Sequence, residues 1–356
     1  MDEVRYGVIG TGMMGVEHIE NLKVVDGATI TAIADPSEHS RQQARWAMRG
    51  TVAEYTDHRA LLESGSVDAV VVASPNMTHV DVLLDVIESG TPVLTEKPLC
   101  TTIADCRRVM AAADAADAVV WVGLEYRYMP AITRLVTDVA AGEIGRLRML
   151  AIREHRFPFL DKVDHWNRFN RNTGGTLVEK CCHFFDLMNL ISAARPVRVL
   201  ASGSQDVNHL DESYDGEVPD ILDNAYVVVE YENGVRAMLD LCMFAEASKE
   251  QGEVVAVGDA GKVEAFTPSM EYRLGRREGG RPGVVVEHVH DDRIRYEGHH
   301  HGSSYLEHLD FLEVVRAGAK PAVSLDDGLL AVAVGVAAHR AIDEGRAVTI
   351  DEVLAD

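Results

Sequence analysis

The chain has 356 residues, of which 47% are hydrophobic and 26% charged, proportions that indicate a folded globular protein and exclude a disordered or fibrous one. Its 34 basic and 57 acidic residues give a net charge of −23, which would repel nucleic-acid phosphates and anionic membrane surfaces, so neither is expected as a partner. The length favours two domains over a single hydrophobic core.

The two ends of the chain and the cysteines add further expectations. No basic region, apolar stretch or cleavage site of a signal peptide precedes the first strand-like segment, so a cytoplasmic location is expected. The uncharged apolar run 329–338 has about half the length that crosses a bilayer and is expected to be a core helix. The five cysteines lack CxxC spacing, which predicts reduced thiols rather than disulfides or a zinc site.

A glycine motif lies between the first expected strand, Val4–Ile9, and the first expected helix, 16–25. Gly10 would permit a tight turn, Gly12 would let a pyrophosphate approach the backbone, and Gly15 would let helix and strand pack closely. The motif alone is a weak signal, but its position between strand and helix predicts a dinucleotide-binding turn. The candidate cofactor-binding residues of this turn are Gly10, Gly12, Met13, Met14 and Gly15.

The second expected strand, 29–34, is followed by Asp35. A carboxylate at this place accepts hydrogen bonds from the hydroxyls of an adenosine ribose and repels a 2′-phosphate. NAD is therefore expected as the cofactor in preference to NADP. Arg41 lies a few residues further on and keeps NADP open, because an arginine there can accommodate the extra phosphate.

Strands and helices continue to alternate up to residue 122, which predicts a parallel sheet covered by helices on both faces. In such sheets ligands bind beyond the carboxyl ends of the strands, and this rule selects 74–76 and 96–98. The further expected strands are 52–55, 67–73, 92–95 and 119–122, and the further expected helices are 38–48, 58–63, 78–89 and 103–117.

The second half of the chain shows few βαβ units and reads as a series of strands. Asn233-Gly234 and the segment 258–261 have the composition of hairpin turns, whereas the polar, acid-rich segment 205–221 reads as a long loop. A helix is expected to begin near Ser303. The expected strands are 147–157, 197–204, 224–231, 235–243, 253–257 and 262–266.

The segment 174–188, GGTLVEKCCHFFDLM, reads as a buried helix with titratable groups. Its Glu179, His183 and Asp186 are spaced by four and three residues, which in one continuous helix places them on a single stripe. Three such groups on a buried stripe are costly unless they are used. The stripe is therefore a candidate functional surface.

Taken together, these motifs resemble the family of glucose–fructose oxidoreductase, inositol dehydrogenase and MocA-type proteins. The EKP tripeptide and the histidine-containing helix are much more specific signals than the glycine motif, and the resemblance covers essentially the whole chain. The matching segments are Tyr6–Gly15, Ala34–Pro36, Ser74–His79 (SPNMTH), Thr95–Leu99 (TEKPL), Glu125–Pro130 (EYRYMP), 174–186 and the tail Ser324–Val348.

The resemblance implies an α/β protein with an N-terminal NAD-binding Rossmann domain, residues 1–123, and a C-terminal α/β domain, residues 124–356. The second domain is expected to contain a large, mostly antiparallel open sheet. Because that sheet often serves as an oligomer interface in the family, a homo-oligomer, either a dimer or a tetramer, is expected to form through it.

The resemblance also implies catalytic roles. Lys97 would polarise a substrate oxygen and stabilise alkoxide character, and Glu96 is similar to a residue that contacts the nicotinamide ribose. His183 is the expected proton carrier, because an imidazole titrates near working pH. Glu179, where the family more often has aspartate, would orient that imidazole or bind a substrate hydroxyl. Asp186 is expected to be a structural partner.

Further polar residues are expected around the ligands. Lys180 also departs from the family pattern; a structural ion pair with Glu179 or Asp186 is favoured, and binding of an acidic or phosphorylated substrate is the alternative. No metal is expected, because His299, His300 and the other histidines lack ligand spacing. Expected near the cofactor are Ser74, Asn76, His79, Glu96 and Arg127. Expected on the substrate side are Lys97, Arg127, Tyr128, Arg153, His155, Trp166, Glu179, Lys180, His183 and His301.

These residues predict an NAD(H)-dependent oxidoreductase acting on a secondary alcohol or ketone of a sugar, inositol or related polyol. Two alternatives stay open: an NAD-dependent glycosidase that oxidises a sugar carbon transiently, and a cofactor-binding regulator without turnover.

Overall fold

The computed structural model describes residues 3–355 and divides into two compact units. The first unit consists of Met1–Glu125, Lys162–Trp166 and Arg293–Leu329. The second consists of Tyr126–Asp161, Asn167–Asp292 and Leu330–Asp356. The boundary expected between residues 123 and 124 lies near the first of these transitions, whereas residues 293–329, expected in the C-terminal domain, belong to the first unit.

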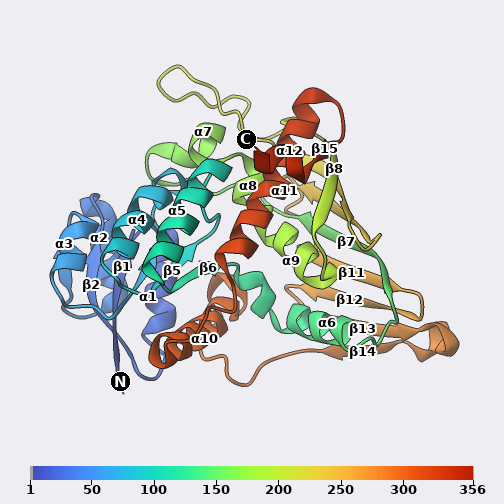
Figure 1. Cartoon of the computed structure of the whole chain (residues 1–356), viewed down its shortest axis with the longest axis horizontal. Helices are drawn as coiled ribbons and strands as arrows, with labels where there is room; N and C mark the ends of the chain where they lie inside the picture. The colour runs from blue at the N-terminus through green and yellow to red at the C-terminus, as the bar shows by residue number, and fades with distance from the viewer. Residues whose placement is uncertain (1–2, 356) are drawn as a thin grey trace. The chain divides into compact units, whose positions relative to one another are not determined.

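The first unit is built on a six-stranded parallel sheet in the order β3-β2-β1-β4-β5-β6, which confirms the predicted Rossmann fold (Figure 1). The four residues of β4 are all fully buried, as expected for a strand covered on both faces. All six strands occur where the alternation predicts them, with ends shifted by one or two residues. Their bounds are β1 Val4–Ile9, β2 Ala28–Ala34, β3 Ala53–Tyr55, β4 Ala69–Val72, β5 Val93–Glu96 and β6 Val120–Gly123.

The helices of this unit follow the strands in chain order. The first helix begins directly after Gly12, three residues earlier than expected, so the glycine motif itself forms the first turn. The bounds are α1 Met13–Leu22, α2 Glu38–Met48, α3 His58–Glu63, α4 His79–Glu88, α5 Ile103–Ala116 and α10 Ser303–Ala317.

Helix α10 explains why residues far along the chain belong to the first unit. It packs against α1, and its fully buried Phe311 meets the rings of Tyr6 and Trp121 edge-on, each with centroids 6.2 Å apart. The Trp121 indole also donates to Glu307 at 2.9 Å, a bond that is buried. The segment therefore completes the core of the nucleotide-binding unit, a role that strand and helix periodicity does not reveal.

The second unit contains a nine-stranded sheet in the order β14-β13-β12-β11-β7-β10-β9-β8-β15. Every neighbouring pair is antiparallel except β7 and β10, so the predicted mostly antiparallel sheet is confirmed. The six predicted strands and both hairpin turns are present, and β13, β14 and β15 were not predicted. The bounds are β7 Leu147–His155, β8 Pro196–Ser204, β9 Asn224–Tyr231, β10 Arg236–Cys242, β11 Gly252–Gly258, β12 Gly261–Thr267, β13 Glu271–Arg276, β14 Val285–His288 and β15 Val348–Thr349.

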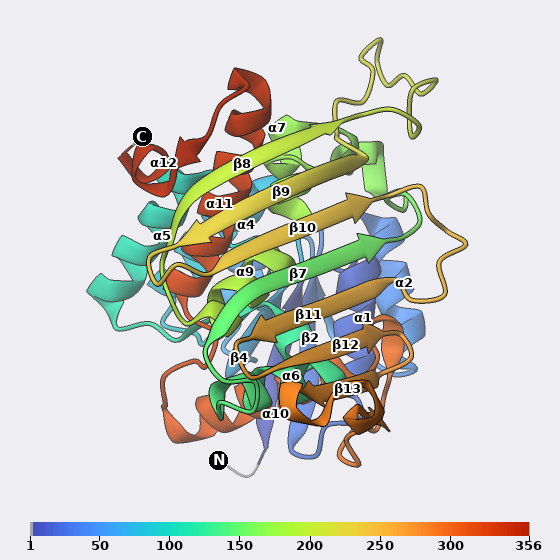
Figure 2. The same cartoon turned by 90° about the vertical axis from the view of Figure 1, so that its right-hand side faces the viewer.

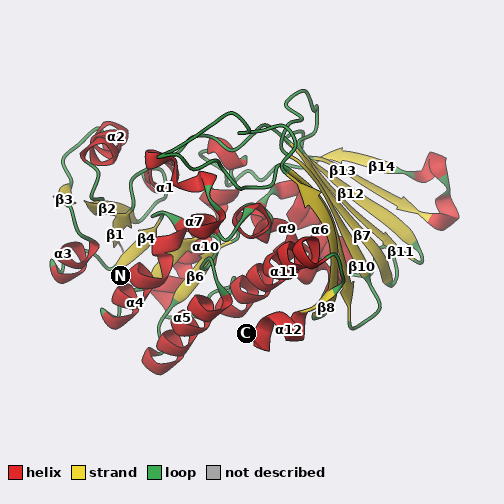
Figure 3. Cartoon of the chain, turned by 90° about the horizontal axis from the view of Figure 1, so that it is seen from above, coloured by secondary structure: helices red, strands yellow, loops and turns green. Residues whose placement is uncertain are grey.

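One face of this sheet is covered and the other is exposed. Helices α6 (Pro130–Ala140) and α9 (Cys182–Ser192) pack on the covered face, where Val227 and Val229 are fully buried (Figure 3). Alternation then turns Val228 to the other face, which Figure 2 shows from the front. There Leu200, Val228 and Met238 lie directly opposite one another on three neighbouring strands, with 41%, 36% and 38% of their surface exposed.

The segment 174–188 is not the single helix on which the stripe argument depended. It forms two short helices, α8 (Thr176–Glu179) and α9, separated by a turn at Lys180 and Cys181. The amides of both turn residues bond to the carbonyl of Thr176, so the helical hydrogen-bond pattern is interrupted there. Glu179 therefore lies on one helix, and His183 and Asp186 lie on the next.

The remaining helices are α7 (Asn170–Thr173), α11 (Leu325–Glu344) and α12 (Ile350–Ala355). The core helix expected at 329–338 is part of α11, and the expected loop 205–221 contains no strand apart from an isolated bridge. Among the described helices, none is both long and apolar enough to cross a membrane.

Candidate active site

The three glycines of the first turn differ in the space that an added side chain would find. Gly10 has φ +85°, and a Cβ atom there would lie 2.5 Å from the Ser74 amide nitrogen. A Cβ atom on Gly15 would lie 2.1 Å from the Gly10 carbonyl oxygen, whereas one on Gly12 would meet nothing within 4 Å. Gly10 and Gly15 are thus required by packing of the turn, and Gly12 leaves the backbone open to an approaching group.

Two polar side chains near this turn have hydrogen-bonding capacity left over. The Thr11 hydroxyl, on a fully buried residue, and the amide nitrogen of buried Asn76 have no partner among residues 3–355. Buried polar groups are normally satisfied, so these atoms indicate a place where a polar ligand completes the structure. Phosphate and ribose oxygens of a dinucleotide fit this requirement.

Asp35 is held in place at the end of β2. Its two carboxylate oxygens accept the Thr11 amide at 2.7 Å and the Ser37 amide at 2.8 Å, which leaves each oxygen further lone pairs. The Arg41 guanidinium donates to the Asp35 carbonyl at 2.5 Å and to Glu38 at 2.6 Å. Arg41, which left NADP as an alternative cofactor, is therefore hydrogen-bonded within its own helix and the loop before it.

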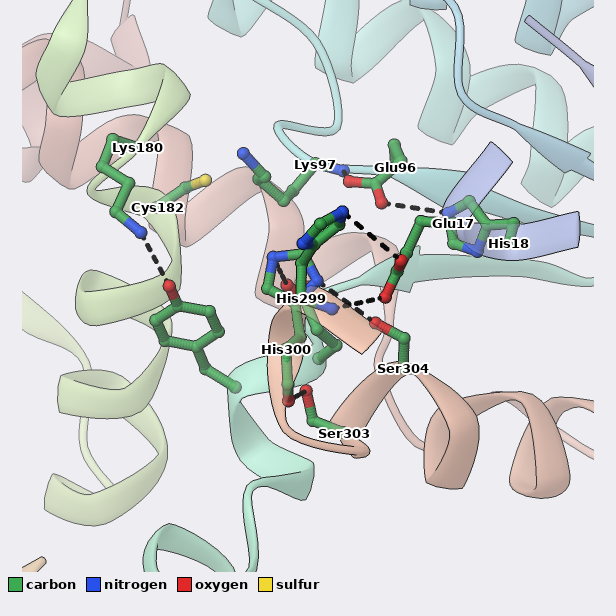
Figure 4. Close-up of polar contacts among 12 residues, drawn as sticks. Glu17, His18, Glu96, Lys97, Lys180, Cys182, His299, His300, Ser303 and Ser304 are labelled. Carbon is green, nitrogen blue, oxygen red and sulfur yellow. Dashed lines mark hydrogen bonds and ion pairs between the residues drawn. The ribbon is translucent and has the colours of Figure 1, made fainter. Parts of the chain in front are cut away.

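Glu96, at the end of β5, bonds to His18, the first of two buried histidines in contact with each other; Figure 4 shows the bond between Glu96 and His18. The His18 ring on α1 lies with Nε2 3.0 Å from Glu96 Oε1, and its Nδ1 lies 2.9 Å from Nε2 of His308 on α10. The Nδ1 atom of His308 has no partner in the described part of the chain. His308 can donate from Nε2 to His18, and His18 can donate from Nε2 to Glu96, so that no buried N–H of the three groups is unsatisfied when Nδ1 of His308 carries no proton.

The protonation of these groups follows from their surroundings. Burial raises the pKa of Glu96, but the hydrogen bond from His18 and the charge of Lys97 outweigh it and lower that pKa to about 2. Burial holds the pKa of His308 well below its ordinary value, with the neighbouring His18 acting in the same direction. Glu96 is therefore an ionised carboxylate, fixed in direction by its hydrogen bond with His18.

Lys97 follows Glu96 directly, and its own amide donates to Glu96 Oε2 at 3.1 Å. The lysine side chain is half-buried, and the Lys97–Pro98 peptide bond is cis. His79, expected beside the cofactor, is fully buried and spans the carbonyls of Pro98 at 2.8 Å and Ser74 at 3.1 Å. His79 thus ties together the loops after β4 and β5, which carry the two predicted ligand-binding segments.

In the second unit, His183 is buried on α9 and stacks on Tyr126. The two rings are nearly parallel, with an interplanar angle of 7° and centroids 4.2 Å apart. The Lys180 amine donates to the Tyr126 hydroxyl at 2.7 Å and forms an ion pair with Glu154 at 3.2 Å. A structural ion pair of Lys180 is therefore present, and it includes Glu154 on β7, a residue that was not selected from the sequence.

Arg127, expected near cofactor and substrate, forms a bidentate pair with Asp186. Its Nε donates to Oδ2 at 2.6 Å, and its Nη2 donates to Oδ1. Asp186 is only 1% exposed, so the pair is a fixed feature of the unit. Tyr128, the neighbouring candidate, is half-buried, and Glu179 on α8 is buried.

Arg153 and His155 share one face of β7, as the alternation predicted, but it is the exposed face. Both side chains bond to Asp240 of β10, at 3.0 Å and 3.1 Å, and Glu154 between them points to the covered face. Because the helix that carries His183 packs on the covered face, we leave Arg153 and His155 out of the substrate site proposed below.

The histidine-rich segment and the Trp166 loop belong to the first unit. The His299 amide donates to buried Glu17 at 2.9 Å, and the His300 ring lies 3.6 Å from Glu125 (Figure 4). Burial lowers the pKa of His301, and the Trp166 ring lies under the Lys162 amine at 4.6 Å. Within residues 3–355, no group of three or more histidine, cysteine or acidic side chains is arranged to hold a metal ion.

The candidate residues thus form two sets, one in each unit. In the first unit, the glycine turn, Asp35, Ser74, Asn76, His79, Glu96 and Lys97 lie at the carboxyl ends of the parallel strands or in the turns that follow them. In the second, Arg127, Glu179, Lys180 and His183 lie on or beside α8 and α9.

Two family models match the chain. Residues 4–124 match the NAD-binding Rossmann fold of the oxidoreductase family, and residues 137–350 match its C-terminal alpha/beta domain. The chain belongs to the Gfo/Idh/MocA oxidoreductase family. It is therefore an NAD-binding oxidoreductase by family.

Curated relatives agree over the full length. A myo-inositol 2-dehydrogenase of Thermotoga maritima is 31% identical over 99% of this chain and 100% of its own. Inositol 2-dehydrogenase 1 of Saccharopolyspora erythraea is 30% identical over 98% of this chain and 96% of its own.

Solved structures of this family share the fold. A probable dehydrogenase from Thermotoga maritima is 28% identical and superimposes with a TM-score of 0.78, covering 98% of this chain and 100% of its own. An Agrobacterium radiobacter oxidoreductase, in complex with NAD+, L-tartaric acid and magnesium, has a TM-score of 0.84 at 18% identity, covering 99% of this chain and 100% of its own. At that identity the likeness shows the fold alone.

Four residues that surround the candidate residues were not selected from the sequence. They are His18, His308, Tyr126 and Glu154. Glu154 had a signal, because it continues the inward alternation of Leu150 and Ile152, and a carboxylate at such a position needs a buried partner. The tyrosine lies in the EYRYMP segment, but nothing in the letters distinguishes it from Tyr128. The two histidines are 290 residues apart, and only folding reveals that they meet.

Proposed function

We propose that this protein is an NAD(H)-dependent dehydrogenase that interconverts a secondary alcohol and a ketone on an inositol, a sugar or a related polyol. The observation that carries the proposal is Lys97 at the carboxyl end of β5, directly after a buried, ionised Glu96. Full-length similarity to a myo-inositol 2-dehydrogenase supports the substrate class.

The chemistry assigns a separate task to each residue. When bound, the nicotinamide supplies the acceptor or donor of the hydride. Lys97 donates a hydrogen bond to the reacting oxygen and stabilises its negative charge. His183 takes the proton from the substrate hydroxyl during oxidation and returns it during reduction, and Glu179 orients the imidazole or binds a hydroxyl.

We assign NAD rather than NADP to the nucleotide turn. Asp35 has lone pairs free for ribose hydroxyls and would repel a 2′-phosphate, and the nearby Arg41 is engaged with Glu38 and the Asp35 carbonyl. Gly12, the Thr11 hydroxyl and the Asn76 amide are the groups that would face the remainder of the dinucleotide.

A neutral polyol is favoured over an acidic or phosphorylated substrate. Lys180 was the residue that raised the second possibility, and its ammonium group is buried, paired with Glu154 and bonded to Tyr126. Removing it from those partners to bind a substrate anion would break the closer of the two ion pairs of the buried Glu154 carboxylate and leave it with Arg156 alone, 3.6 Å away.

The test follows absorbance at 340 nm with NAD and a panel of inositols, aldoses, sugar acids and sugar phosphates. We expect NADH formation with at least one neutral polyol or sugar. NADH formation only with sugar acids or phosphates would contradict the substrate class. Cleavage of a glycoside without net NADH would instead identify an NAD-dependent glycosidase, and NAD binding without any turnover would identify a regulator.

We also propose that the protein forms a dimer or tetramer through the exposed face of the nine-stranded sheet. The row of Leu200, Val228 and Met238 is apolar and lies on the face opposite to α6 and α9. Light scattering should report an oligomer that Val228→Lys disrupts. A monomeric wild-type protein would contradict this proposal.

A further inference from the structure

We propose that Tyr126 is a positioning residue for His183, and that the buried Lys180–Glu154 ion pair anchors Tyr126. The inference rests on the proposed function for its kinetic readout, because it assumes that His183 exchanges the substrate proton.

The contact between the two rings restricts rotation of the imidazole. The rings of Tyr126 and His183 are stacked at 4.2 Å with an angle of 7°, and both residues are buried, with 8% and 2% of their surface exposed. Phe184 meets the Tyr126 ring edge-on, with centroids 5.7 Å apart and an angle of 68°. Since the imidazole cannot tilt out of this plane without moving a buried aromatic ring, the plane in which its nitrogen atoms lie is fixed.

The position of Tyr126 is set in turn by a buried charge. The Lys180 amine donates to the tyrosine hydroxyl at 2.7 Å (Figure 4). The ammonium group therefore holds the ring at its hydroxyl end. Lys180 lies in the turn between α8 and α9, so the break in the helix is what brings its side chain to Tyr126.

Glu154 connects this arrangement to the sheet. The carboxylate is 2% exposed on the covered face of β7, 3.2 Å from the Lys180 amine, and it also accepts from the Gln251 amide at 3.2 Å. Burying an ion pair is costly and contributes little net stability, so we assign to it the fixing of local geometry. A continuous set of contacts then leads from β7 through Lys180 and the tyrosine ring to His183.

Fixed geometry matters because the proposed proton transfer requires an imidazole nitrogen directed at the substrate oxygen. A histidine that samples several orientations loses rate without losing affinity for either ligand. The inference therefore predicts an effect on kcat with little effect on KM, and it gives Lys180 a role that is not substrate binding.

The experiment compares Tyr126→Leu, Tyr126→Phe and Lys180→Met in the full-length protein, with Tyr272→Leu as the control. Tyr272 is a fully buried tyrosine on β13 of the same unit, whose hydroxyl donates to Asp138 and whose ring lies 5.0 Å from the Arg134 guanidinium. Tyr126→Leu should lower kcat by roughly 30-fold and leave KM for NAD within about threefold. Tyr126→Phe retains the stacked ring and should restore most of that activity, with Lys180→Met between the two.

A second readout does not depend on turnover. In spectra of histidine-labelled protein, assigned with His183→Gln, the carbon-bound protons of the His183 ring should be shifted upfield, because they lie above the face of Tyr126. Tyr126→Leu should abolish that shift, Tyr126→Phe should keep it, and Lys180→Met should alter it. If Tyr126→Leu does not fold, Tyr126→Phe and Lys180→Met still test whether Tyr126 positions His183.

Three outcomes would overturn the inference. They are unchanged His183 signals in Tyr126→Leu, an equal loss of kcat in Tyr272→Leu, and wild-type kcat and His183 signals in Lys180→Met. If the wild-type protein oxidises no polyol, the proposed function fails instead, while the magnetic-resonance readout still tests whether Tyr126 positions the imidazole.

Discussion

At the scale of single residues, we assign the proposed preference for NAD to Asp35. Its carboxylate accepts the Thr11 and Ser37 amides and still has lone pairs for ribose hydroxyls. Asp35→Ala should lower kcat/KM with NAD by about 10- to 100-fold, because two hydrogen bonds of roughly 1 kcal/mol each are lost, and should raise kcat/KM with NADP. The ratio of kcat/KM for the two cofactors measures this change. An unaltered ratio would refute the ribose assignment.

For Lys97 we predict a different effect, because its proposed contact is with the reacting oxygen. Lys97→Ala should lower kcat by about 10²- to 10³-fold, the usual loss for a donor that stabilises developing negative charge, and leave the Kd for NAD within about threefold. Steady-state kinetics and calorimetric titration of NAD provide the two numbers. A parallel loss in both would assign the lysine to cofactor binding.

Lys97 and His183 could be selected from the amino-acid sequence because motifs with specific spacing surround them. His18, Tyr126 and His308 carry no such pattern. Each becomes significant only through one neighbour, respectively Glu96, His183 and His18, and such contacts between distant segments are not encoded in local spacing.

At the scale of elements, the β1–α1 turn contains Gly15, which its packing requires, and Gly12, which we propose for cofactor binding. Gly15→Ala places a Cβ atom 2.1 Å from the Gly10 carbonyl oxygen and should cost at least about 3 kcal/mol of the free energy of unfolding. Gly12→Ala meets no atom and keeps an ordinary φ of −69°, so its free energy of unfolding should stay within about 1 kcal/mol.

The same two variants should differ in cofactor binding. Gly12→Ala should weaken NAD by at least about tenfold, because the added methyl group occupies the backbone surface that the pyrophosphate approaches. Chemical denaturation and NAD titration of each variant measure the two effects. A folded Gly12→Ala protein with wild-type NAD affinity would show that the dinucleotide does not approach this glycine.

The break between α8 and α9 shows why an element can be predicted correctly in composition and wrongly in continuity. The segment 174–188 has buried, helix-compatible residues throughout, so periodicity alone favours one helix. Its turn at Lys180 accompanies contacts with Glu154 and Tyr126, neither of which lies in the segment. The turn at Lys180 thus occurs together with tertiary contacts. The helix propensity of the segment 174–188 does not by itself require that turn.

At the scale of the whole molecule, buried neutral histidines should make stability depend on pH. Burial lowers the pKa of His339 to about 4, and it lowers the pKa values of His79 and His308 as well. Between about pH 4 and 6.5 the unfolded chain therefore binds more protons than the folded one, so stability falls as the pH falls through this window. His339 alone contributes up to about 3 kcal/mol.

Urea denaturation at intervals from pH 7.5 to pH 5.0 would measure that loss. His339→Gln provides the matched control, because the glutamine oxygen can still accept the Leu177 amide that now bonds to His339 Nε2 at 3.1 Å, but it does not titrate. The variant should show a shallower dependence on pH than the wild type. Identical slopes would mean that His339 titrates normally in the folded chain.

The sequence by itself determined the family, the Rossmann order of elements and the strands β7 to β12, and it predicted roles for Lys97, His183 and Asp35, since all of these depend on periodicity, turn composition and motif spacing within short stretches. Only the tertiary structure decided that residues 293–329 complete the first unit, that Glu154 is the partner of Lys180, and that Arg153 and His155 lie on the exposed face of the sheet. The physical reason is that packing partners are chosen across long chain separations. A residue's type limits which partner it needs, and the fold alone brings that partner within reach.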